Sequence, residues 1–145
     1  MPDSNIDKIA LENQIADLEN QVKILNNQND ELEKQKIDLI NFITSFNDMY
    51  NKCKTSFDSI NKKVAEIKYE GSTVDSSLKD LSEINSGIAK ITNGAIKNID
   101  EKKQAIDKKV NDMEIYINNK INTIKVDIQK CNSLIEKYRV DISAL

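Results

Sequence analysis

The sequence predicts an all-α protein, a long antiparallel hairpin of two helices that forms a helical coiled coil. Apolar residues of the N-terminal half recur in two seven-residue rows offset by four, which is the a/d pattern of a coiled coil. Few residues interrupt helices, with Gly 3 and Pro 1, and aromatic residues are only 5%. This composition suits long helices that bury a narrow stripe, called the seam below, rather than a thick core. The rows are Leu11, Leu18, Leu25, Leu32, Leu39, Phe46, Cys53, Ile60 and Ile67, and Ile15, Val22, Asn29, Lys36, Ile43, Tyr50, Phe57 and Val64.

The first helix is expected over about residues 4–68. Ser4 followed by Asp7 resembles a capping box, which would start the helix. The segment Asn26–Asp30 contains poor helix formers, but the apolar rows keep their phase across it. We therefore predict one continuous helix of roughly 95 Å.

Two seam positions of this helix, Asn29 and Lys36, are polar. A polar seam residue can fix register or partner choice at a cost in stability. Alternatively, this end of the coiled coil is wetter, with Lys36 reaching past the seam toward solvent.

The turn is expected at about residues 69–72. Gly71 can adopt the left-handed conformation that ends a helix, and Ser72 can cap the next helix with Asp75 as the reciprocal acid. A glycine stop followed at once by a restart is typical of an αα-hairpin.

The second helix is expected over about residues 73–144, completing a single domain over residues 1–145. Met113, Ile117 and Ile121 follow each other at steps of four and four, which shifts the heptad phase. Its predicted seam is Val74, Leu78, Leu81, Ile84, Ile88, Ile91, Ala95, Ile99 and Ile106, followed by Val110, Ile117, Ile121, Ile124, Ile128, Cys131, Ile135, Tyr138, Ile142 and Leu145.

A turn centred near residue 70 would fix which residues face each other. This register places Phe46 opposite Gly94 and Ala95, Tyr50 opposite Ile91, and Phe57 opposite Ile84 and Gly87. Gly87 and Gly94 each cost about 1 kcal/mol inside a helix. Either aromatic side chains of the first helix or a closely approaching partner helix would compensate this cost.

The sequence favours a protein without catalysis, metal or cofactor. With His 0, catalytic triads and His-bearing zinc sites are excluded, and Cys53 and Cys131 are expected as buried, reduced seam residues. The net charge of -3 comes from interleaved acids and bases, which argues against nucleic-acid binding. No apolar run approaches the roughly 20 residues that cross a bilayer, and no secretory signal is visible. We expect a soluble protein that begins in the cytoplasm, without membrane insertion.

Apolar residues off the seam point instead to a protein partner, because intramolecular pairing leaves them uncovered. Either of two partners could pack on these residues: a second copy of the chain, giving a four-helix bundle, or a helix of another protein. The off-seam residues are Ile24, Ile37, Ile40, Phe42, Met49, Ile96, Ile115 and Tyr116. The partner-binding candidates are Ile40, Phe42, Phe46, Met49, Tyr50, Gly87 and Gly94.

The chain resembles the WXG100/Esx-like proteins of type VII secretion, whose hairpin turn carries Trp-x-Gly. Tyr69-Glu70-Gly71 stands at the matching place, with Tyr in place of Trp. The length and the leading heptads, Ile9 to Leu39, are most similar to the small α-helical proteins associated with LXG toxins in Gram-positive bacteria. The resemblance covers nearly the whole chain and rests on this short motif.

The resemblance implies a targeting chaperone: a helical partner that binds the helical N-terminal domain of an LXG effector and helps present it to the secretion ATPase. It also implies export by a Sec-independent route. The family signal is Tyr-x-x-x-Asp/Glu, whereas Tyr138 and Asp141 place the acid one position early, so the partner would supply the signal. Tyr138 is also a seam residue. A self-associating coiled-coil scaffold or spacer is the alternative function.

Overall fold

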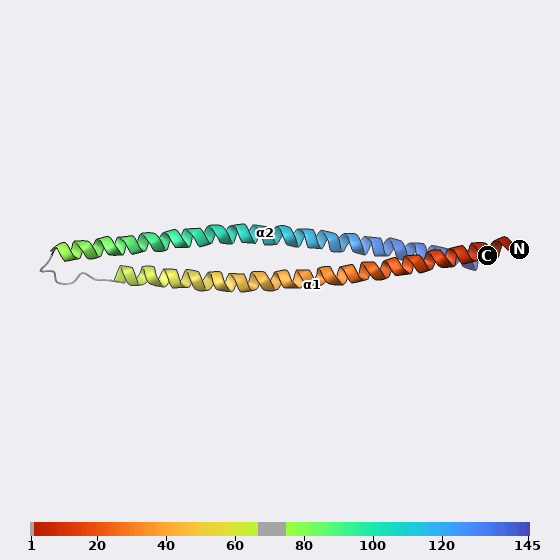
Figure 1. Cartoon of the computed structure of the whole chain (residues 1–145), viewed down its shortest axis with the longest axis horizontal. Coiled ribbons are helices and arrows are strands. Elements are labelled where there is room, and N and C mark those ends of the chain that lie inside the picture. The colour runs from red at the N-terminus through yellow and green to blue at the C-terminus, as the bar shows by residue number, and fades with distance from the viewer. Residues whose placement is uncertain (1, 67–74) are drawn as a thin grey trace. The chain divides into compact units, whose positions relative to one another are not determined.

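The chain folds into two long helices, α1 (Pro2–Glu66) and α2 (Asp75–Ser143). The computed structural model describes the backbone of residues 2–66 and 75–145 and the side chains of residues 3–66 and 82–145. The helices pack against each other, and Figure 1 draws them side by side. This confirms the predicted all-α hairpin, and the described ranges contain no strand. Of the predicted turn motif, Tyr69, Gly71 and Ser72 lie outside the described residues, and Asp75 is the first residue of α2.

Helix α1 is continuous through Asn26–Asp30, as the unbroken apolar phase predicted. It begins at Pro2, however, so Ser4 lies inside the first turn and the predicted capping position is wrong. Proline is well suited to the first helical position, because its missing N–H would have no helical partner there and its φ is already helical.

The structure divides into two compact units, each built from a segment of both helices. Unit 1 comprises Met1–Leu39 and Asp112–Leu145, and unit 2 comprises Ile40–Asn111. Within unit 1, Arg139 pairs with Glu19 and the Cys131 thiol donates to Gln21 Oε1 at 3.7 Å. Within unit 2, Tyr50 bonds to Asp100 and Asn61 to Asn93. In both units the contacts run antiparallel.

Unit 1 contains the tightest packing of the described chain. The buried hydrophobic side chains are Ile117, Ile121, Ile124, Cys131 and Ile135, all of them on α2. Of the predicted double step Met113–Ile117–Ile121, Ile117 and Ile121 are buried, whereas Met113 is exposed, so only the second step of four lies in the seam. Cys131 is a buried free thiol, as expected. On α1, Asn29 and Lys36 are half-buried in the seam, and Asn29 Oδ1 is buried without a hydrogen-bond partner in the described structure.

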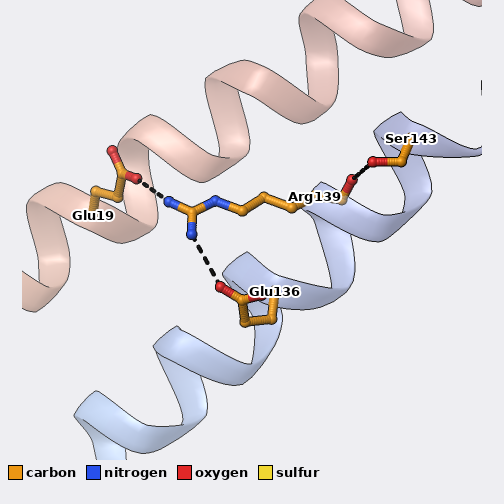
Figure 2. A network of polar contacts seen from close by, with 4 residues as sticks. All are labelled: Glu19, Glu136, Arg139 and Ser143. Atoms are coloured by element: carbon orange, nitrogen blue, oxygen red, sulfur yellow. Dashed lines mark hydrogen bonds and ion pairs between the residues drawn. The ribbon is translucent and has the colours of Figure 1, made fainter.

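A polar network joins the two helices of unit 1 at their exposed edge (Figure 2). The Arg139 guanidinium donates to Glu19 Oε1 on α1 at 3.1 Å and to Glu136 Oε1 on α2 at 3.0 Å. The Ser143 hydroxyl donates to the Arg139 carbonyl oxygen at 2.9 Å. More than half of the Arg139 and Glu19 side-chain surfaces is accessible to solvent, so the pair is screened by water and salt.

We expect Arg139→Ala to lower the free energy of unfolding by no more than about 1 kcal/mol, because exposed ion pairs contribute little. Urea unfolding at low and high salt would measure this, and the difference from wild type should shrink at 1 M salt. A loss above about 2 kcal/mol at both salt concentrations would show that Arg139 stabilises the fold by packing.

In unit 2 the α1 seam departs from the predicted heptads after Tyr50. The half-buried residues continue as Lys54, Phe57, Asn61 and Val64, a step of four, three, four and three. Cys53 and Ile60, predicted in the seam, are exposed. In a straight α-helix, residues spaced by seven rotate about 20° per heptad away from the neighbouring helix. The step of eight from Phe46 to Lys54 adds one residue and so brings the seam of α1 back to face α2.

The first part of the α2 seam also differs from the prediction. Ile84, Ile88 and Ile91 are exposed, whereas Thr92 is 5% exposed and Asn85 and Ala89 are half-buried. The seam here keeps the phase of the later residues, since Asn85, Thr92, Ile99 and Ile106 are spaced by seven. Thr92 fits this site because its hydroxyl donates to the Ile88 carbonyl oxygen at 2.8 Å. The prediction was wrong here because it chose the more apolar row, Ile84, Ile88 and Ile91, over the row that keeps the seven-residue spacing.

The register of unit 2 is shifted from the one predicted. Tyr50 lies beside Asp100 and not beside Ile91, nine residues earlier on α2. The predicted register assumed a turn that is symmetric about residue 70. In the structure the first turns of α2 extend past the end of α1 (Figure 1), so the packed seam sets the register instead.

Candidate partner-binding surface

The two sides of unit 2 differ in chemistry, and one of them is polar. The Tyr50 hydroxyl donates to Asp100, and the Asn61 amide donates to Asn93 Oδ1 at 2.9 Å. Lys103 donates to Asp107 at 2.5 Å. Because Asn93, Asp100 and Asp107 are spaced by seven residues, they form one edge of α2. We call this side the polar face.

Tyr50 lies in the seam, and its hydroxyl reaches the polar face through its bond to Asp100. The ammonium groups of Lys54 and Lys103 lie 5.8 and 5.3 Å from the centroid of its ring, within cation–π range. A hydrogen bond with the Tyr50 hydroxyl raises the pKa of Lys54, and the nearby Tyr50 and Asp100 charges act in the same direction. These groups partner one another, so the polar face offers few free apolar contacts to a second protein.

The other side of unit 2 is apolar. Met49 and Cys53 of α1 line one groove of about 210 Å³ together with Lys102 of α2, so these residues mark the same side of the hairpin. The groove floor is formed by the seam residues Phe46, Tyr50, Ile99 and Ile106. Residues on the same helix edges extend this surface. We define the apolar face as Phe42, Met49, Cys53 and Ile60 of α1 with Ile84, Ile88 and Ile91 of α2, all of them exposed.

Helical spacing assigns these residues to one side. Phe42 lies seven residues before Met49, and Ile60 seven after Cys53, so all four share an edge of α1. Ile88 lies fourteen residues, two heptads, before Lys102 on α2, and Ile84 and Ile91 lie four and three residues from Ile88. The rings of Phe42 and Phe46 stack with centroids 6.2 Å apart, which joins the exposed edge to the groove.

The structure separates the partner-binding candidates that the sequence grouped together. Phe42 and Met49 lie on the apolar face, with exposures of 53% and 66%, and Phe46 and Tyr50 are half-buried in the seam. Ile40 is exposed but lies seven residues before Asn47, on the opposite edge from Phe42. Of the other residues predicted off the seam, Ile24, Ile37, Ile115 and Tyr116 are exposed as expected, whereas Ile96 is half-buried.

Gly87 and Gly94 are exposed on α2, and a Cβ atom added at either would meet nothing within 4 Å. The predicted packing of aromatic side chains against these glycines is therefore wrong. Within the described chain their cost of about 1 kcal/mol each has no compensating contact. Gly87 precedes the exposed Ile88, and Gly94 precedes the half-buried Ala95.

We expect Gly87→Ala and Gly94→Ala each to raise the free energy of unfolding by about 1 kcal/mol, and the double variant by about 2 kcal/mol. Urea unfolding of the isolated protein would measure this. Ser86→Ala is the neighbouring control, with an expected gain of about half that of a glycine. Destabilisation by either glycine substitution would reveal a close contact at that position.

Comparison with protein-family models, curated proteins and solved structures gave no match. Neither helix, over residues 2–66 and 75–145, has an apolar stretch that could cross a bilayer. The same residues contain no cluster of three or more metal-binding side chains. The proposed function therefore rests on the polar and apolar faces of unit 2.

Tyr138 and Asp141, the predicted candidate for a degenerate export signal, lie within α2 in unit 1. Tyr138 is half-buried, in agreement with its predicted seam position, and Asp141 is exposed. The sequence reasoning missed Ile84, Ile88, Ile91, Cys53 and Ile60 as surface residues, because it assigned all five to the seam. The unbroken seven-residue phase running back from Ile106 was the signal that could have found the three isoleucines.

Proposed function

We propose that this chain is a non-catalytic helical adaptor that holds a second protein by helix-to-helix packing on the apolar face of unit 2. The observation that carries the proposal is a row of large apolar side chains on both helices of one side, beside a groove between them. Exposed apolar surface of this extent is typical of interaction sites.

The size of the face is adequate for a stable complex. From Phe42 to Val64 the surface is roughly 33 Å long at 1.5 Å per residue. Two packed helices make it about 20 Å wide, or roughly 650 Å². A specific interface buries about 800 Å² on each partner, so a helix or helix pair lying on this face would approach the usual size.

The resemblance to type VII secretion partners suggests which protein binds there. We propose the helical N-terminal domain of an LXG-type effector, with this chain helping to target it for export. Tyr138 is half-buried in α2, and the acid at Asp141 is one position early, so in this proposal the export signal comes from the effector.

The two cysteines provide a test of the binding surface. Cys53 is exposed on the apolar face and Cys131 is buried, so iodoacetamide should modify Cys53 much faster in the isolated protein. Co-expression with the helical N-terminal domain of an LXG-type effector should give a stable complex in which Cys53 modification slows at least tenfold. Cys131 serves as the internal control.

A complex in which Cys53 reacts as fast as in the free chain would contradict binding on this face. Failure of every LXG-type effector domain to form a complex would contradict the secretion role. Slow Cys53 modification in the isolated chain, reversed by dilution, would support self-association and so the scaffold alternative.

A further inference from the structure

Four lysines border the apolar face of unit 2. Lys52 and Lys63 follow Met49 and Ile60 by three residues, so they border the face on α1. Lys102 lines the groove, and Lys109 follows it by seven residues on the same edge of α2. All four are exposed, and none has an ion-pair partner among the described residues.

Among the described acids, Asp38 borders the face, because it lies four residues before Phe42. Asp100 and Asp107 belong to the polar face, where they accept hydrogen bonds from Tyr50 and Lys103. Asp48, Glu83 and Glu101 are not three or four residues from any residue of the apolar face, so they lie farther from its border. The protein as a whole is acidic, with a net charge of -3, so a border with four lysines and one described acid is a local property of this side.

We propose that the apolar face selects an acidic amphipathic helix, one whose apolar stripe is flanked by Asp or Glu. The proposal rests on the adaptor function above and names the chemistry of its partner. Apolar side chains of the partner would fill the groove beside Met49 and Cys53, and its acids would pair with the four lysines. Complementary charge sets partner choice and association rate more than total affinity.

Two other occupants fit these observations less well. A second copy of the chain, packed face to face, would bring the lysine borders together, and like charges disfavour such an interface. An anionic membrane would match the lysines, but a bilayer is flat. The groove is lined by residues of both α1 and α2, so a helix can pack along it, and the open space at Gly87 and Gly94 permits the close approach of a helix backbone.

The test uses the full-length chain and two synthetic 28-residue peptides with Ile and Leu at the a and d positions. One peptide carries Glu at its e and g positions and the other carries Lys. Fluorescence anisotropy should show that the Glu peptide binds at least tenfold more tightly than the Lys peptide at 20 mM salt. The difference should shrink at 1 M salt, where the screening length falls to about 3 Å.

Two matched double variants test whether the preference for the Glu peptide depends on the lysines of the proposed border. Lys102→Glu with Lys109→Glu should weaken binding of the Glu peptide about tenfold and strengthen binding of the Lys peptide. Lys90→Glu with Lys97→Glu changes the same charge at the same seven-residue spacing on α2, away from the border. This control pair should leave the preference for the Glu peptide unchanged.

Equal binding of both peptides, or an equal effect of the two double variants, would overturn the proposed charge selection and leave the adaptor function standing. Loss of effector binding in the cysteine experiment would overturn the adaptor function itself. Co-sedimentation of the chain with phosphatidylserine vesicles, or a concentration-dependent dimer that excludes the Glu peptide, would assign the face to a membrane or a second copy.

Discussion

Ile121→Ala is expected to lower the free energy of unfolding by about 3 kcal/mol. Ile121 is 4% exposed in the seam of unit 1, so the substitution removes buried methyl and methylene groups and leaves a cavity. Large-to-small changes at such sites cost about 2–5 kcal/mol. The higher helix propensity of alanine returns only about 0.4 kcal/mol. Urea unfolding followed by circular dichroism would measure the change.

The matched control is Ile115→Ala, six residues earlier on the same helix. Ile115 is 51% exposed, so its loss should change the unfolding free energy by no more than about 0.5 kcal/mol. Equal destabilisation by the two substitutions would show that the seam does not run through Ile121 as described, or that another molecule covers Ile115.

Phe42→Glu combined with Met49→Glu is expected to weaken binding of the effector domain at least a hundredfold. Both residues are large, exposed and adjacent to the groove, as is typical of the residues that dominate interfaces. The substitutions replace apolar contacts with carboxylates that would be desolvated in the complex. Isothermal titration calorimetry with the purified effector domain would measure the loss.

The fold should survive these changes. Phe42 stacks on Phe46, so its removal is expected to cost about 1 kcal/mol of stability, whereas Met49→Glu alone should cost less. Ile40→Glu is the control, because Ile40 is similarly exposed but lies on the opposite edge of α1. Binding that is lost equally with Ile40→Glu would show that the polar edge also contacts the partner.

The sequence predicts the fold well because the coiled-coil period is a strong local signal. The apolar rows correctly gave two helices of near-equal length, the continuity of α1 through Asn26–Asp30 and the burial of Ile117 and Ile121. These properties depend on residues three and four positions apart. Heptad spacing registers such neighbours directly.

The binding surface was harder to predict, because it depends on the phase of the seam at each point. A shift of one residue turns Ile91 to solvent and Thr92 to the interior, although isoleucine is the more hydrophobic of the two. The sequence offered two rows of four-three spacing in this part of α2. Only the register against α1, fixed by contacts such as Asn61 to Asn93, selects the less apolar one.

The side chains of the seam are buried to different extents in the two units, and this affects how often each unit unfolds locally. The buried hydrophobic side chains of the described chain all lie between Ile117 and Ile135, whereas the one buried polar side chain, Thr92, marks a stretch with small and polar neighbours. Amide protons near Thr92 should therefore exchange with solvent sooner than those near Ile121, through local unfolding. A ligand that binds only the folded form slows such opening by mass action. Under the proposed adaptor function, a partner bound on unit 2 would protect the amides near Thr92 from exchange more than those near Ile121.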